Sequence, residues 1–144
     1  MGPARPRPAS VRPTSWLGRL SGLRILVVDD DCQVRRMVGA ILSRAGATVR
    51  LAESPQSAFE SVTDFKPQLI VSDLEMPEED GCSLMRRIRA LGADSGGMPS
   101  IALSGWDAEE ARAKALGAGF FAHMRKPFLP EELVRTAAAV ARSG

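Results

Sequence analysis

Polar residues capable of phosphate or metal chemistry stand at the ends of four apolar runs in this sequence. They are Asp29, Asp30, Asp73, Ser104 and Lys126. Ligands of open α/β sheets bind outside the carboxyl ends of the strands, so side chains placed there face a ligand and not the core. One aspartate at a strand end usually caps a helix or opens a turn. Several polar strand ends that converge meet the requirement of a functional site. Asp73 is the candidate reactive group, and a turn that ends in Pro77 follows it.

Apolar segments alternate with segments of helical periodicity along the chain. Strands are predicted at 23–28, 48–51, 69–73, 100–103 and 119–124. Helices are predicted within 34–42, 54–65, 84–91, 107–117 and 130–140, from apolar residues at helical spacing and from capping residues. Parallel strands need crossover connections, which the alternating helices provide. The pattern therefore predicts an α/β fold, a doubly wound parallel sheet with helices on both faces and the polar strand ends at one edge.

The first 22 residues differ in composition from the rest. They are rich in proline, arginine, serine and glycine and have no apolar period, so they cannot offset the entropy of ordering by burial. Residues 1–24 hold five arginines and no acidic residue, a basic lead that could contact nucleic acid or a membrane. A solvated tail is favoured because the arginines are spaced apart and only one aromatic residue, Trp16, lies among them. Residues 1–22 are therefore predicted to be a flexible lead or linker, and residues 23–144 the folded domain.

Composition places the chain among globular proteins. Its hydrophobic and charged fractions, 44% and 25%, are close to globular averages, and 144 residues suit one domain. No run is long enough to cross a membrane and the N-terminus lacks the apolar segment of a secretory signal, so a cytoplasmic protein is expected. The cysteines, Cys32 and Cys82, have no metal-ligand spacing and fit a reducing compartment.

Four segments together resemble the receiver domain of two-component response regulators, of the chemotaxis-regulator type. The segments are Ile25-Leu26-Val27-Val28-Asp29-Asp30-Asp31, Ser72-Asp73-Leu74-Glu75-Met76-Pro77 with Asp80-Gly81, Leu103-Ser104-Gly105 and Arg125-Lys126-Pro127-Phe128. Each is weak alone, but their order and spacing are specific, and the resemblance covers residues 23 to 142. It implies a flavodoxin-like strand order of 2-1-3-4-5.

By this resemblance, Asp73 accepts a phosphoryl group from a sensor histidine kinase or a histidine phosphotransfer protein. Mg²⁺ would be bound directly by Asp30, Asp73 and the backbone carbonyl of Glu75, and through water by Asp29. Charge supports a metal, because close carboxylates repel by about 4 kcal/mol per pair at an effective dielectric of about 20. An oxygen-only site at a phosphoryl centre suits Mg²⁺. Asp31 is expected to cap the first helix and not to bind the metal.

The resemblance assigns phosphoryl binding to Ser104, Gly105 and Lys126. Lys126 would pair with Asp73 at rest and with a phosphoryl oxygen afterwards, which neutralises charge that develops in transfer. Ser104 would donate its hydroxyl, and Gly105 leaves the neighbouring backbone accessible. Ser104 and His123 would form a switch that is read out on the surface of the fourth helix, fifth strand and fifth helix. The Lys126–Pro127 peptide bond is expected to be cis.

Two positions depart from the commonest family pattern. Ser104 replaces the more frequent threonine, and His123 stands where tyrosine or phenylalanine is common. The alternative for His123 is a satisfied surface or core histidine that takes no part in a switch. Glu75 and Trp106 occupy positions that tune phosphoryl lifetime in the family, and Trp106 could instead contact a partner.

The expected protein is a signalling module that catalyses its own aspartyl phosphorylation and dephosphorylation, not a conventional multiple-turnover enzyme. A downstream protein effector is expected, without direct nucleic acid or membrane binding, and a phosphorylation-dependent dimer is left open. Only one helix follows Lys126 in the sequence. The protein is therefore expected to be a stand-alone receiver or a receiver excised from a hybrid histidine kinase or other larger regulator.

Functions of other classes fit the residues less well. An aspartyl-phosphate hydrolase would use an Asp-x-Asp at the end of the first strand, which Asp29-Asp30-Asp31 superficially offers, but it leaves the Asp73 stretch unexplained. A degenerate receiver used only for docking would not need the full set of acidic, hydroxyl and lysine residues. A flavin-binding protein wants a phosphate loop after the first strand, where this acidic cluster would repel a phosphate.

Overall fold

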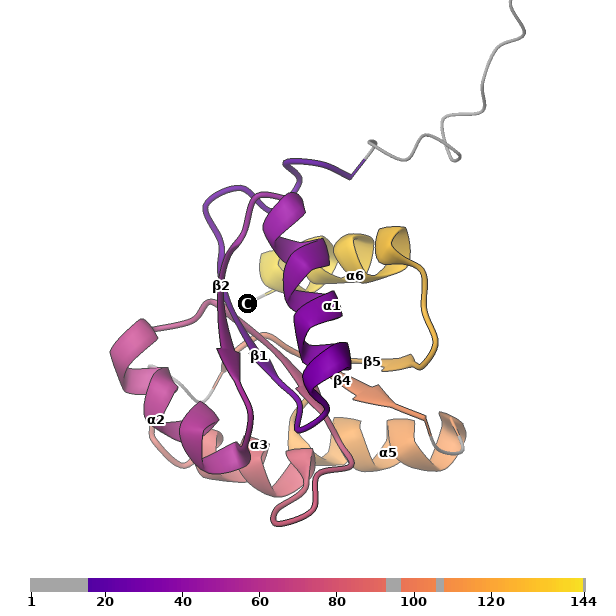
Figure 1. Cartoon of the computed structure of the whole chain (residues 1–144). Helices are drawn as coiled ribbons and strands as arrows, with labels where there is room; N and C mark the ends of the chain where they lie inside the picture. Colours follow the sequence, from indigo (N-terminus) through magenta and orange to yellow (C-terminus); the bar gives the residue numbers. More distant parts are fainter. Residues whose placement is uncertain (1–15, 93–96, 106–107, 144) are drawn as a thin grey trace, which may run out of the picture.

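The computed structural model describes residues 16–92, 97–105 and 108–143 of the chain. Strands and helices alternate among these residues (Figure 1). The strands are β1 (Arg24–Val28), β2 (Thr48–Ala52), β3 (Leu69–Asp73), β4 (Ser100–Ser104) and β5 (Ala122–Arg125). The helices are α1 (Cys32–Arg44), α2 (Pro55–Phe65), α3 (Gly81–Arg89), α5 (Ala108–Ala118) and α6 (Pro130–Ser143).

All strand pairs are parallel, and their order in the sheet is β2-β1-β3-β4-β5. The register aligns the carboxyl ends of neighbouring strands. Val28 pairs with Ser72, so the residues that follow them, Asp29 and Asp73, lie side by side. At the next ends along the sheet, the backbone N–H of Lys126 donates to the carbonyl of Ser104 at 2.8 Å. The predicted fold class and strand order are confirmed, and the polar strand ends share one edge.

Helices cover both faces of the sheet, with α1 and α6 on one face and α2, α3 and α5 on the other (Figure 1). Leu42 of α1 and Leu133 of α6 belong to the core on the first face. On the second face, Ile70 of β3 packs with Ile88 of α3. Every residue of β3 and β4 is buried, because these strands are covered on both faces. This explains why their sequences are continuous apolar runs that end only at the site.

Capping side chains fix where the helices next to the site begin. Asp31 Oδ1 accepts the N–H groups of Gln33 at 2.9 Å and Val34 at 3.2 Å, so Asp31 is the N-cap of α1, as expected. Asp80 caps α3 by accepting the N–H of Ser83 at 2.8 Å. Residues 29–31 connect β1 to α1 and residues 74–80 connect β3 to α3, and each connection ends at the capping aspartate.

The folded domain begins earlier than Leu23, so the predicted boundary is wrong for residues 16–22. Trp16 is 9% exposed and Leu20 is 1% exposed, and both belong to the core on the α1 and α6 face. The Leu20 N–H donates to the Ala45 carbonyl at 2.8 Å. Trp16 and Leu20, four residues apart, anchor this segment to the core, although apolar residues do not recur along it at a regular spacing. The predicted flexible lead otherwise falls on residues 1–15, outside the described residues.

Strand β5 starts at Ala122, later than the predicted Gly119. Gly119 has φ of 109° and follows the end of α5. The Phe120 N–H donates to the Ala115 carbonyl at 3.0 Å, the closing bond of a Schellman motif. Phe120, whose apolar side chain suggested a strand, packs instead against α3 and α5 beside Cys82. The predicted cap of α5, Asp107, lies outside the described residues.

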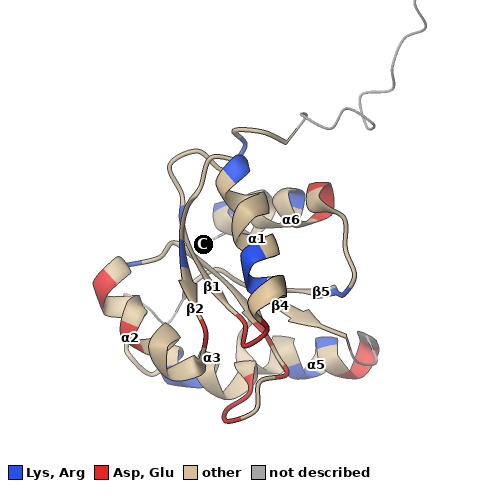
Figure 2. Ribbon diagram, viewed as in Figure 1, with Lys and Arg blue, Asp and Glu red and all other residues tan. Residues whose placement is uncertain are grey.

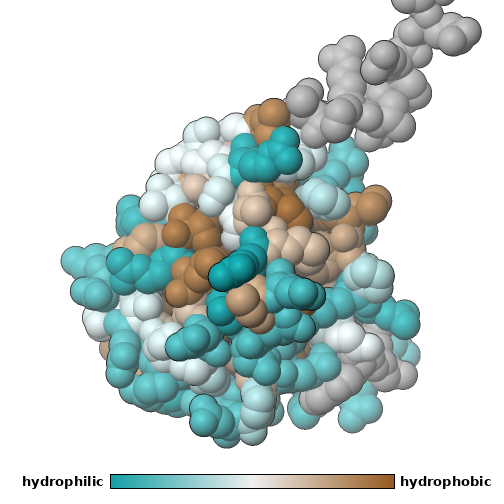
Figure 3. All heavy atoms as spheres, in the orientation of Figure 1, coloured by the Kyte–Doolittle hydropathy of each residue, from teal (hydrophilic) through white to brown (hydrophobic). Residues whose placement is uncertain are grey.

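Apolar atoms are visible on the face formed by α1 and β2 (Figure 3). The exposed large apolar residues of these elements are Met37 and Leu51. Among the described strands, β2 lies at an edge of the sheet and pairs with β1 alone. Within the described part of the chain, no helix has the length and apolar character that crossing a membrane requires.

Candidate functional site

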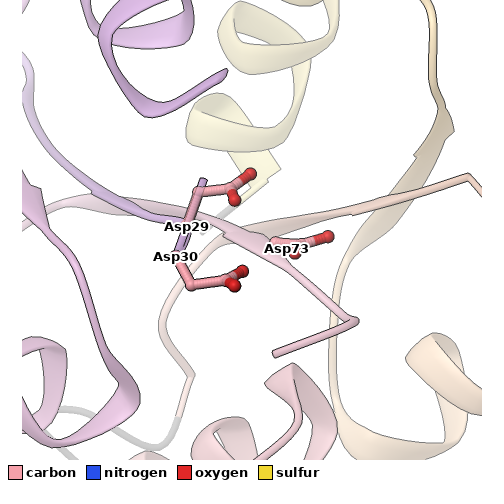
Figure 4. A group of neighbouring side chains, drawn as sticks. All are labelled: Asp29, Asp30 and Asp73. Carbon is pink, nitrogen blue, oxygen red and sulfur yellow. The ribbon is translucent and has the colours of Figure 1, made fainter. Parts of the chain in front are cut away.

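Three carboxylates gather at the carboxyl ends of β1 and β3 (Figure 4). Each of Asp29, Asp30 and Asp73 offers a carboxylate oxygen within 4.8 Å of the others. Asp29 and Asp73 are 1% and 3% exposed, whereas Asp30 faces solvent. Figure 2 shows acidic residues on the loops that leave these strand ends. The sheet register thus brings together the three carboxylates that the sequence placed at separate strand ends.

Lys126 supplies a positive charge to this cluster. Its Nζ lies 3.1 Å from Asp73 Oδ1 and 3.5 Å from Asp29 Oδ2. The Lys126–Pro127 peptide bond is cis, as expected. The resting pair of Lys126 with Asp73, which the resemblance implied, is therefore present.

The charges in the cluster shift one another's protonation. Burial, together with the charge of Asp29, raises the pKa of Asp73 to about 6, and Lys126 opposes this rise. Burial also raises the pKa of Asp29. Burial disfavours the charged form of Lys126, but its hydrogen bond to Asp73 and the nearby carboxylates outweigh burial, so the pKa of Lys126 is raised. One lysine therefore compensates two buried carboxylates only in part.

The residues of the cluster fit a magnesium ion. Asp29 Oδ2 is buried and has no hydrogen-bond partner among the described residues, since its 3.5 Å approach to Lys126 is a charge contact without hydrogen-bond geometry. A buried carboxylate oxygen in this condition is costly unless a further cation contacts it. The donor atoms are all oxygens, which is the set that small hard cations prefer.

Two contacts of the site were not predicted from the sequence. Arg35 Nη1 donates to the backbone carbonyl of Asp29 at 2.8 Å and braces the turn after β1. Arg35 lies one helical turn after the cap Asp31, and this spacing was an available signal. Glu75 Oε1 accepts the N–H of Gly105 at 2.8 Å, and no pattern in the sequence indicated where this side chain points.

The proposed switch residues lie on neighbouring strands. Ser104 is fully buried at the end of β4, and His123 of β5 pairs with Ala102 of β4. Ala102 and Ser104 are two residues apart in one strand, so His123 and Ser104 share a face of the sheet. Burial, together with the charge of Arg112, lowers the pKa of His123, and no described residue forms a hydrogen bond with its buried Nε2. Trp106, which was expected to flank the site, lies outside the described residues.

The fold and the site define a class of protein: a doubly wound parallel sheet with an acidic pocket and a lysine at its carboxyl edge. Residues 25–138 match the family described as response regulator receiver domain. A 14.6 kDa protein from the sodA1 3′ region of Leptolyngbya boryana is 40% identical over 116 residues, 81% of this chain and 88% of that protein. Response regulator MprA of Mycobacterium ulcerans is 38% identical over 120 residues, 83% of this chain and 50% of MprA.

Solved structures agree with these relatives. Chemotaxis protein CheY4 of Vibrio cholerae is similar with a TM-score of 0.77 and 27% identity, over 82% of this chain and 98% of CheY4. The Francisella response regulator 1452 receiver domain has a TM-score of 0.77 and 25% identity, over 85% of this chain and 98% of that domain. The chain belongs to the response regulator receiver domain family of two-component signalling.

Membership of this family fixes the general role of the chain. Receiver domains are signalling modules that pair with histidine kinases and effector domains, and they generally bind Mg²⁺ at an acidic pocket. The chain spans about half the length of the MprA relatives that it matches.

Proposed function

We propose that Asp73 is the phosphoacceptor of this receiver. The observation that carries the proposal is the buried Asp73 carboxylate, paired at 3.1 Å with Lys126 beside two further carboxylates. A carboxylate oxygen of Asp73 attacks the phosphorus of a phosphohistidine on a sensor histidine kinase or a histidine phosphotransfer protein. The P–N bond breaks with its electron pair on the imidazole, which takes up a proton, and an acyl phosphate forms on Asp73.

Residues of the same edge would bind and neutralise the phosphoryl group. The Lys126 ammonium moves from Asp73 to a phosphoryl oxygen, where it offsets charge in the transition state. The Ser104 hydroxyl and the Gly105 N–H donate to the remaining oxygens. The proposed magnesium ligands are Asp29 through water and Asp30, Asp73 and the backbone carbonyl of Glu75 directly. Bound Mg²⁺ supplies further positive charge to the transferring phosphoryl group.

Hydrolysis of the aspartyl phosphate would also take place at this site. Water attacks the phosphorus, the bond between phosphorus and the Asp73 oxygen breaks, and phosphate leaves as the carboxylate is restored. The protein thus catalyses its own phosphorylation and dephosphorylation once per signal and is not a conventional multiple-turnover enzyme.

Phosphorylation would be read out through Ser104 and His123. Movement of the Ser104 hydroxyl toward a phosphoryl oxygen vacates space on the face that it shares with His123, and the imidazole turns inward to fill it. The responding surface is then α5, β5 and α6. Imidazole NMR signals with and without beryllofluoride test this readout, because an unmoved His123 resonance rules the switch out. Loss of the shift in Ser104→Ala supports it.

The partners follow from this chemistry and belong to the same proposal. A histidine kinase or phosphotransfer protein supplies the phosphoryl group, and a downstream protein effector binds the responding surface. A phosphorylation-dependent dimer is the alternative use of that surface. The protein would bind neither nucleic acid nor a membrane directly, and it would act in the cytoplasm with its phosphoryl donor.

Intact-mass spectrometry after incubation with acetyl phosphate and Mg²⁺ tests the phosphoacceptor. One phosphoryl group is expected on the wild-type protein and none on Asp73→Asn. Asp64→Asn is the matched control, because the Asp64 side chain is 80% exposed on α2. Equal labelling of Asp73→Asn and wild type would overturn the proposal, as would labelling that persists undiminished in EDTA.

A further inference from the structure

The side chain of Glu75 joins the loop that follows β3 to the residue that follows β4. Glu75 comes two residues after Asp73, and Gly105 follows Ser104 at the end of β4. Glu75 Oε1 accepts the backbone N–H of Gly105 at 2.8 Å. The charge of Glu75 also reaches Lys126, whose charged form it favours. In the unphosphorylated site, the Glu75 carboxylate therefore lies beside the phosphoryl-binding residues, although this carboxylate has no part in the proposed chemistry.

The Glu75 carboxylate competes with a phosphoryl group for the same donor. A phosphoryl group on Asp73 brings about −1.5 to −2 of charge and three acceptor oxygens. It needs hydrogen-bond donors, and the N–H of Gly105 is one that the proposed function assigns to it. Hydrogen bonds from an N–H to an anion are short and strong, so the bond to Glu75 has to break before a phosphoryl oxygen takes its place. Repulsion between the two anions acts in the same direction.

The described residues leave open space beside the Cα of Gly105, while its N–H is occupied by the bond to Glu75. A Cβ built on Gly105 would meet no atom within 4 Å, and Gly105 is exposed. The backbone before Glu75 is fixed, because the Leu74 N–H donates to the Leu103 carbonyl at 2.9 Å. The part of Glu75 that can move is thus its half-buried side chain. Rotation of this side chain suffices to free the Gly105 N–H.

We propose that the Glu75 carboxylate is an internal stand-in for the phosphoryl group, which holds the Gly105 N–H in the unphosphorylated protein and releases it when Asp73 is phosphorylated. The inference rests on the proposed function of Asp73. Glu75 is then a positioning residue that stabilises the resting state of the site. Removal of its carboxylate should favour the phosphorylated state, the opposite of what a helper in phosphoryl binding would do.

Titration with beryllofluoride in the presence of Mg²⁺ measures this competition. Glu75→Ala keeps the backbone carbonyl proposed for the metal and removes only the competing anion. It should bind the mimic about three- to tenfold more tightly than wild type, the range of one exposed charge-assisted hydrogen bond. Glu75→Gln, which keeps an acceptor without charge, should fall between the two.

Glu78→Ala is the matched control, because it removes an exposed carboxylate from the same loop. Its affinity for the mimic should equal that of wild type. An unchanged or weaker affinity in Glu75→Ala overturns the inference. A gain of the same size in Glu78→Ala also overturns it, since the effect would then be general charge.

The amide signal of Gly105 gives a readout that does not depend on affinity. At rest, the amide proton of Gly105 should resonate at different positions in wild type and Glu75→Ala. With beryllofluoride bound, the two positions should converge, because both proteins then donate to the mimic. Identical resting signals, or a difference that persists in the bound state, would contradict the exchange of partners.

The experiment separates this inference from the function on which it rests. If the wild-type protein takes up neither acetyl phosphate nor beryllofluoride at Asp73, the proposed function fails. If both are taken up and Glu75→Ala changes neither the affinity nor the Gly105 amide, only the role of Glu75 fails.

Discussion

Lys126 Nζ lies 3.1 Å from Asp73 Oδ1, although the two residues are 53 positions apart in the chain. The same ammonium lies 3.5 Å from Asp29 Oδ2. The side chain that follows β5 therefore contacts one carboxylate at the end of β3, with β4 between the two strands, and one that follows β1, with β3 and β4 between. The charge balance of the resting pocket depends on this single residue among the described contacts.

Replacing Lys126 should show how much the two buried carboxylates, Asp29 and Asp73, destabilise the fold when this positive charge is missing. In EDTA at neutral pH, Lys126→Met is expected to lower the free energy of unfolding by about 1–3 kcal/mol, less than for a fully buried pair because Lys126 is partly exposed. Added Mg²⁺ should restore part of the loss. Urea unfolding followed by circular dichroism measures both effects. Lys114→Met, on the exposed side of α5, is the control, and an equal loss there would contradict the prediction.

Asp73→Asn should stabilise the metal-free protein at high pH and not at low pH. Burial raises the pKa of Asp73 from 3.8 to about 6, so the folded protein binds more protons than the unfolded chain between these values. Stability from this group is therefore present at low pH and lost as pH rises through about 6. The variant should gain about 1–2 kcal/mol above that pH, a value reduced for solvent screening.

The advantage of Asp73→Asn should vanish toward about pH 4, where the wild-type carboxyl is protonated. Urea unfolding in EDTA across this pH range is the measurement. Asp64→Asn, at an exposed carboxylate, should show no such pH dependence. A wild-type protein more stable than Asp73→Asn at high pH would mean that Lys126 outweighs burial.

Leu20→Ala tests whether the segment before β1 is part of the fold. Leu20 is 1% exposed, and its truncation is expected to cost about 2–4 kcal/mol of unfolding free energy. Leu17→Ala is the matched control, because Leu17 is 41% exposed and should change stability by less than about 0.5 kcal/mol. Thermal or urea unfolding distinguishes the two. If both variants lost equally little stability, residues 16–22 would belong to the flexible lead and not to the folded domain.

Gly81→Ala should disturb the acceptor residue through the backbone. A Cβ on Gly81 would collide with the Asp73 carbonyl oxygen and press on Leu74. The expected loss is about 1–3 kcal/mol of stability, with slower labelling of Asp73 by acetyl phosphate. Gly117→Ala, where a Cβ meets no atom within 4 Å, should leave both properties close to wild type. Normal labelling of Gly81→Ala would show that the turn adjusts without moving Asp73.

The sheet and the main site residues could be predicted because they depend on local signals. Asp29, Asp73 and Lys126 each follow an apolar run, and parallel pairing brings such ends together. Asp31 was predicted correctly as a cap because an N-cap bond spans only two or three residues. The order of strands came from family resemblance, since pairing partners are not encoded in any short segment.

Features that depend on distant packing could not be predicted in this way. Trp16 and Leu20 form a pair too short to show periodicity, and their burial depends on α1 and α6. Phe120 looked like a strand residue because apolar character alone does not distinguish a strand from a helix closure. The Glu75 bond to Gly105 joins two loops, and its geometry depends on a side-chain rotamer.

The anchoring of Trp16 has a practical consequence for labelling the protein. Trp16 and Ala45 share a core at the far end of α1, a helix of 13 residues that begins beside the acidic cluster. Such a helix is about 20 Å long, so Trp16 and Asp73 lie at opposite ends of the domain. A fluorophore or an immobilisation tag attached ahead of Trp16 therefore leaves the acceptor edge open to a macromolecule. The same tag placed in the turn after β3 would stand in the path of every phosphoryl donor.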